Sequence, residues 1–110
     1  MSFDYARAQS TALRLLTRFG QVGKLRTIVA GQSPVDVAIT LAVLDYRLSD
    51  IDGTRIVVGD RLIYVAPQGV TAIKPGNKIL DAAGVPYSVM DAKPIAPAGV
   101  VVYYEVQGRK

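Results

Sequence analysis

The sequence predicts a mainly β protein, a small β-barrel of about six or seven short strands preceded by an N-terminal α-helix. Three observations support this fold class. Only residues 1–20 have a helical period, residues 21–110 are rich in Val, Ile and Thr, and turn-forming residues recur about every 8–12 residues in that part. A chain of 110 residues has the size of one domain, so we expect a single domain over residues 1–110.

The first segment has the apolar period of an amphipathic helix, which we expect within residues 3–19, with Gly20 at its end. We expect this helix to pack through Ala12, Leu16 and Phe19. The opposite side is basic, with Arg7, Arg14 and Arg18. Such a stripe is typical of a solvated helix face, and a dedicated anion-binding role is the alternative.

Two strands are expected next, over residues 24–30 and 35–48, because both runs are rich in β-branched residues. In the second run every other residue from Val37 to Val43 is large and apolar, which predicts a core face. The alternate positions are small, so another subunit can approach closely there. The candidate interface residues are Ala38, Thr40 and Ala42, with Tyr103 and Tyr104 of the last expected strand. For each of them, packing inside the barrel is the alternative.

The segment "LSDIDGTR", residues 48–55, reads as an ordered, polar connecting loop, because Asp50, Asp52 and Gly53 are turn-forming residues. Two nearby carboxylates raise the question of calcium. The spaced acidic ligands and the closing Glu of an EF-hand loop are missing, so we expect no metal at this loop.

A phrase is repeated in "TRIVVGDRLIYV", residues 54–65, and "AIKPGNKIL", residues 72–80. We expect a strand ending at Val58 or Lys74, then a tight corner at Gly59-Asp60 or Gly76-Asn77, and then a second strand. Neither copy matches a phosphate-binding loop. "DAAGVPY" adds another turn, and "SVMDAK" and "VVVYYEVQGR" supply the last strands.

Composition excludes several kinds of chemistry. The chain has no cysteine and no histidine, so it has no disulfide, thiolate zinc site, His-based metal site, or Ser-His or Cys-His nucleophile pair. We expect no enzymatic activity, no metal and no cofactor. The net charge of +4 favours an anionic partner only weakly. The longest apolar stretch, residues 37–44, is far below the roughly 20 residues that cross a bilayer, so we expect no membrane partner.

The order of elements resembles that of the small head-completion proteins of long-tailed bacteriophages, also called head-tail connector, stopper or neck proteins. The resemblance covers nearly the whole chain. It rests on the helix segment "FDYARAQSTALRLLTRFG", the middle segment "DYRLSDIDGTRIVVGDRLIYV", the segment "GNKILDAAGVPYSVMDAKPIAP" and the closing strand "VVVYYEVQGR".

This resemblance implies a structural virion protein of the neck, assembled in the host cytoplasm. Members typically form a homo-oligomeric ring, commonly a hexamer, between the portal or adaptor protein and the tail or tail-terminator protein. The ring closes the head around its packaged double-stranded DNA and provides a surface on which the tail docks. In several members a loop points to the channel axis. The matching candidates here are Asp45, Arg47, Asp50, Asp52 and Arg55, in a segment with no unusually long insertion.

Alternatives remain beside this interpretation. A tail-terminator ring protein is the alternative within the phage neck. An OB-like nucleic-acid-binding barrel would need exposed aromatics interleaved with cations, whereas Tyr64, Tyr87, Tyr103 and Tyr104 lie in separate apolar runs. An enzyme would have to work through Asp, Glu, Lys or Tyr, and Glu105 has no obvious catalytic partner.

Overall fold

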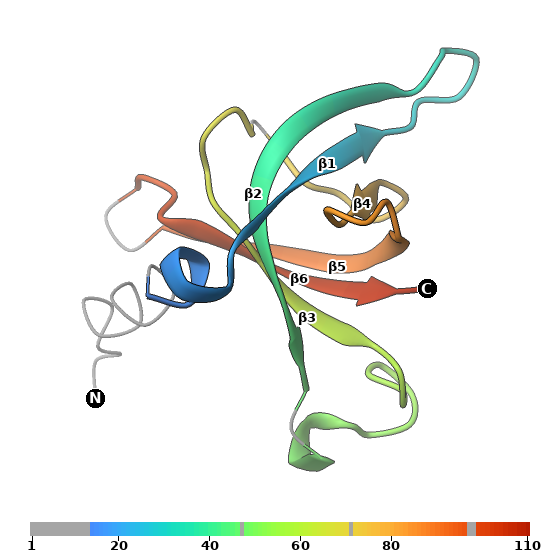
Figure 1. Cartoon of the computed structure of the whole chain (residues 1–110). Coiled ribbons are helices and arrows are strands. Elements are labelled where there is room, and N and C mark those ends of the chain that lie inside the picture. Colours follow the sequence, from blue (N-terminus) through green and yellow to red (C-terminus); the bar gives the residue numbers. More distant parts are fainter. Residues whose placement is uncertain (1–13, 47, 71, 97–98) are drawn as a thin grey trace.

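The computed structural model describes residues 14–46, 48–70, 72–96 and 99–110. They form a closed antiparallel barrel in which the strand order is β1-β2-β3-β6-β5-β4 (Figure 1). The mainly β fold class and the barrel are therefore confirmed, with six strands. The elements are β1 (Gln21–Thr27), β2 (Val35–Asp45), η1 (Leu48–Asp50), β3 (Arg61–Val65), β4 (Lys78–Leu80), β5 (Pro86–Ile95) and β6 (Tyr103–Arg109).

A short helix over residues 14–19 precedes β1. Leu16 is buried, as predicted, and Ala12 lies outside the described residues. The prediction for Phe19 is wrong, because this side chain is 54% exposed and the Arg18 guanidinium lies 5.4 Å from its ring centroid. The helix ends here because the chain turns sharply at Gly20, where a Cβ atom would lie 1.9 Å from the carbonyl oxygen of Leu16.

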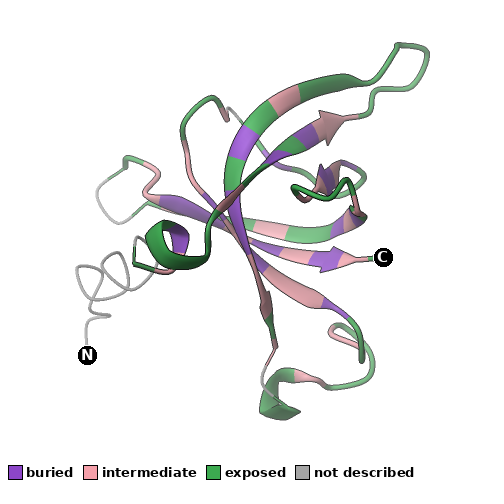
Figure 2. Ribbon diagram, in the orientation of Figure 1, coloured by how far each residue is buried: buried purple, intermediate pink, exposed green. Residues whose placement is uncertain are grey.

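The core lies inside the barrel, where alternate residues of each strand point inward (Figure 2). On β2 these are the large residues that the sequence pattern assigned to one face, including Ile39 and Leu41. Burying each large aliphatic side chain contributes about 1.5–3 kcal/mol. The largest fully buried side chains are Leu41, Ile63, Val65, Ile79 and Val106.

The expected strands that end at Val58 and Lys74 are not strands. Before the first corner, the carboxylate of Asp52 accepts hydrogen bonds from the amides of residues 54, 55 and 56, at 2.9, 2.8 and 3.0 Å. Three successive amides bound to one carboxylate cannot pair with a neighbouring strand. Before the second corner, the amide of Lys74 donates to the side chain of Asn77 instead of to a strand. In both segments, hydrogen bonds between backbone amides and a nearby side chain therefore override the strand preference of the β-branched residues.

The first predicted corner is confirmed as a tight turn over residues 57–60. The amide of Asp60 donates to the carbonyl oxygen of Val57 at 3.1 Å, and Gly59 has a φ of 96°. A positive φ at the third position is the mark of a type II turn. The Asp60 carboxylate also accepts a hydrogen bond from the amide of Val57, at 3.1 Å.

The second corner, residues 74–77, has the same geometry. The amide of Asn77 donates to the carbonyl oxygen of Lys74 at 3.1 Å, Gly76 has a φ of 95°, and the Asn77 side chain accepts from the amide of Lys74 at 2.8 Å. Asp60 and Asn77 are also the buried polar residues of the described part of the chain, at 5% and 7% exposure. The repeated phrase thus encodes one structural corner used twice.

Candidate functional site

The loop between β2 and β3, described over residues 48–60 and here called the η1 loop, is fastened to the last strand. The Asp60 carboxylate accepts hydrogen bonds from the Arg109 guanidinium at 2.8 and 3.0 Å and from the Gln107 amide at 2.8 Å. Gln107 also donates to the carbonyl oxygen of Arg55. The hydrogen bond from Arg109 is the main cause that lowers the pKa of Asp60 to about 2. We call Asp60, Gln107 and Arg109 the latch, because they hold the η1 loop against β6.

The acidic channel-loop candidates differ in what they contact. Asp45 pairs with Arg61 on the neighbouring strand β3. Asp52 caps the loop, and the backbone amide of Thr54 and those that follow it lower the pKa of its carboxyl. Asp50 is exposed and forms no ion pair with any residue that the structure describes. Asp50 is therefore the acidic candidate of this loop that is available to a partner.

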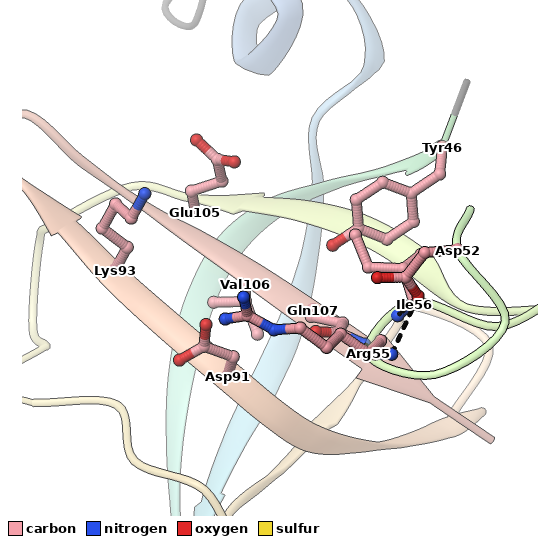
Figure 3. A pocket seen from close by; sticks show the side chains of 9 residues that line it. All are labelled: Tyr46, Asp52, Arg55, Ile56, Asp91, Lys93, Glu105, Val106 and Gln107. Atoms are coloured by element: carbon pink, nitrogen blue, oxygen red, sulfur yellow. Dashed lines mark hydrogen bonds between the residues drawn. The ribbon is translucent and has the colours of Figure 1, made fainter. Parts of the chain in front are cut away.

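The basic candidates of this loop are Arg47 and Arg55. Arg55 turns back over the barrel and points toward Asp91 (Figure 3). Arg47 lies outside the described residues. The η1 loop is thus tied to β6 near Arg55 and Asp60, whereas η1 itself stays exposed at the lower end of the molecule in Figure 1.

A polar pocket of about 220 Å³ opens on the outer face where the η1 loop meets β5 and β6 (Figure 3). A β-bulge between Val89 and Asp91 turns Asp91 outward, opposite Gln107, and Lys93 lies opposite Glu105. The pocket is lined by Tyr46, Asp52, Arg55, Ile56, Asp91, Lys93, Glu105, Val106 and Gln107.

The pKa of Tyr46 reflects its burial and the charges around this pocket. Burial, followed by the negative charge of Glu105 and of more distant carboxylates, raises the pKa of Tyr46 to about 12. The phenol is therefore protonated at neutral pH and can donate a hydrogen bond but cannot act as a base. The pocket carries charges of both signs, from Asp52, Arg55, Asp91, Lys93 and Glu105.

Within the described residues, no three Asp or Glu side chains are grouped so that they could hold a metal ion. No helix in the same part of the chain has the length and apolarity needed to span a membrane.

The candidate interface residues fall into two groups. Ala38 and Thr40 are exposed on the outer face of β2. The prediction that Ala42, Tyr103 and Tyr104 lie on a free interface surface is wrong, because all three are buried within the chain. Tyr104 packs in the barrel core, and Tyr103 makes an edge-to-face contact with Tyr64, with 5.2 Å between ring centroids.

Two of the three residues of the basic helix face lie in the described part of the chain. Arg14 and Arg18 are exposed on the helix over residues 14–19, as expected for a solvated side, and Arg7 lies outside the described residues. Arg18 covers the ring of Phe19. Neither Arg14 nor Arg18 lines the polar pocket described above.

Sequence reasoning missed the exposed apolar side chains of the loops. Leu48 is 89% exposed and Val58 is 86% exposed, both on the η1 loop. The sequence pattern assigned both residues to strand ends, so it did not predict their exposure on a loop. At the β1–β2 turn, Ile28, Val29 and Val35 are exposed as well. Exposed apolar side chains mark binding surfaces where they gather in one patch, whereas single ones are common on protein surfaces.

No family model, curated protein or solved structure matches the chain.

Proposed function

We propose that the chain is a structural subunit of the neck of a long-tailed bacteriophage. In this role, copies of the chain form a ring between the portal or adaptor protein and the tail. The ring closes the DNA-filled head and offers the docking surface for the tail.

The observation that carries the proposal is the exposure of large apolar side chains at two ends of a closed barrel. Leu48 and Val58 lie on the η1 loop, and Ile28, Val29 and Val35 lie at the β1–β2 turn, at the other end of the molecule in Figure 1. A ring subunit must contact the next copy and also the structures above and below it. Apolar side chains at both ends of one small domain suit such a subunit.

The construction of the barrel also supports an assembly role. Each of the six strands pairs with a neighbour on both sides, so partners are bound mainly by side chains and loops. The latch fixes the η1 loop before any partner arrives, which lowers the entropy lost on binding. The order of helix, barrel strands and connecting loop agrees with the resemblance to neck proteins.

The burial of the tyrosines argues against the alternative of a single-strand nucleic-acid-binding barrel. Such a barrel stacks bases on exposed aromatic rings. Tyr87, Tyr103 and Tyr104 are buried, and Tyr64 is engaged with Tyr103. Proteins of the tail-terminator type share the ring architecture, and the experiment below separates them from head-completion proteins.

The test is complementation of the encoding phage after deletion of the gene. Without the protein we expect heads that lose DNA or fail to join tails, and the wild-type chain should restore tailed particles. Filled heads joined to tails of abnormal length would favour the tail-terminator alternative. Normal infectious yield without the protein would refute a role in the neck.

A further inference from the structure

An apolar groove of about 270 Å³ lies on the outer face, where β1 and β2 meet the turn after β4. Its floor combines small residues with two larger apolar ones. We call it the outer groove, and the residues of its floor are Val22, Gly23, Ala38, Leu80, Ala82 and Gly84.

The rim of the outer groove carries one lysine and one carboxylate, and the two differ in whether they are already engaged. Lys24, opposite Leu80 across the β1–β4 pair, is exposed and forms no ion pair with a residue that the structure describes. Lys78 lies two positions before Leu80, on the same side of β4. Asp81 also borders the groove, but its carboxylate accepts hydrogen bonds from the amides of residues 83 and 85, at 3.0 and 2.9 Å. The groove therefore suits an apolar side chain that is accompanied by a carboxylate.

The element η1 offers this combination. Leu48 is 89% exposed, and Asp50 is exposed with no ion pair to a described residue. We call these two side chains the η1 knob. The latch at Asp60 holds the loop that carries them, so the η1 knob is presented on an ordered support.

The groove and the η1 knob cannot meet within one chain. Val22 and Ala38 line the groove on the β1–β2 pair, whereas η1 follows the end of β2 at the lower end of the molecule in Figure 1. The path along β2 from Ala38 to Asp45 spans about 23 Å at a rise of about 3.3 Å per residue. A surface and its complement at two separate places on one subunit produce a head-to-tail contact between copies.

We propose that the η1 knob of one copy docks in the outer groove of the next copy. Leu48 packs on the groove floor beside Ala38 and Ala82, and Asp50 faces Lys24. The contact is heterologous, so it builds a closed ring when the rotation between copies divides a full turn. This inference deepens the proposed neck function, and it rests on that function for the closure of the ring.

Cysteine cross-linking tests the contact, because the chain has no native cysteine. Purified full-length L48C and A82C, both changed at exposed positions, are mixed and oxidised. We expect a disulfide-linked dimer in the mixture and none from either variant alone, since the bond needs Cβ atoms within about 4.5 Å. A chain with both substitutions should give a ladder of covalent oligomers.

The matched control is V58C mixed with A82C, because Val58 is equally exposed on the same loop but lies outside the η1 knob. Equal cross-linking of this control would overturn the proposal. A dimer of L48C with itself that forms as fast as the mixed dimer would also overturn it, because a heterologous contact does not bring residue 48 of two copies together.

Charge reversal provides a second measurement. D50K on the L48C chain, or K24D on the A82C chain, should lower the initial rate of cross-linking about two- to fivefold, and the combination should restore it. Unchanged rates in both single variants would remove Asp50 and Lys24 from the contact.

The same cross-linking on assembled particles separates this inference from the proposed function. Complementation without a Leu48–Ala82 cross-link in the particles would overturn the contact and leave the neck role intact. A specific cross-link in a protein that the phage does not need for joining heads to tails would support the contact and refute the neck role.

Discussion

The two corners encoded by the repeated phrase have the same local geometry but different attachments to the barrel. In each, a glycine with a φ near 95° precedes a buried polar residue that caps the turn. Asp60 is attached to β6 through its charged side chain, which binds Gln107 and Arg109. Asn77 is attached to β5 through the backbone, because its carbonyl oxygen accepts from the amide of Val89 at 3.0 Å.

This difference shows how one turn sequence can serve two purposes. The neutral corner continues the hydrogen bonding of the sheet around Asn77. The charged corner fastens a long loop, and that loop carries the exposed Leu48 and Asp50. The ionic attachment therefore links the stability of the barrel to the position of the proposed contact surface.

Replacing the two capping residues should have the largest effect on stability, and the size of the loss should differ between the two corners. D60A should lower the free energy of unfolding by about 3 kcal/mol, because it removes the turn cap and leaves the hydrogen-bond donors of the latch without their acceptor. N77A should cost about 1–2 kcal/mol, because it removes only the cap. Urea unfolding followed by circular dichroism measures both, and equal losses would contradict the assignment of the latch to Asp60.

Acid should affect the Asp60 corner specifically. The pKa of Asp60 is lowered to about 2, chiefly by its hydrogen bond with Arg109, so its ionised form stabilises the fold. That contribution is fully present above the unfolded-state pKa of about 3.9 and is lost as the pH falls through about 2. The stability advantage of the wild type over D60N should therefore shrink between about pH 4 and pH 2. An advantage that stays constant across this window would contradict the ionic latch.

Replacing either turn glycine by alanine should have the smallest effect on stability. The two substitutions test whether both corners need the same backbone conformation. A Cβ atom at Gly59 or at Gly76 would meet no atom within 4 Å, so the cost comes from the positive φ alone. G59A and G76A should each lower the free energy of unfolding by about 1 kcal/mol. Clearly unequal losses would show that the two turns differ in their backbone requirements.

The sequence predicted the barrel because the alternation of large and small residues on β2 and the turn signals are local features. It also predicted both corners, whose Gly-Asp and Gly-Asn pairs have strong conformational preferences. It failed for residues 54–58, where the carboxylate of Asp52 binds three amides that the β-branched composition would have placed in a strand.

The site was less accessible to sequence reasoning. The latch joins residues that are 47 and 49 positions apart, and a pattern within one segment does not report such contacts. Tyr103 and Tyr104 were candidates for an interface because they are large and aromatic. Their burial depends on the packing of β6 against its neighbours and on the ring of Tyr64, which only the three-dimensional structure provides.

Electron cryomicroscopy of the head-tail junction in purified particles of the encoding phage tests the central claim most directly. We expect a ring of six-stranded barrels between the portal complex and the tail, with η1 of each copy against β1, β2 and the turn after β4 of the next copy. A junction into which no such barrel fits, in particles that are complete and infectious, would contradict the assignment of this chain to the neck.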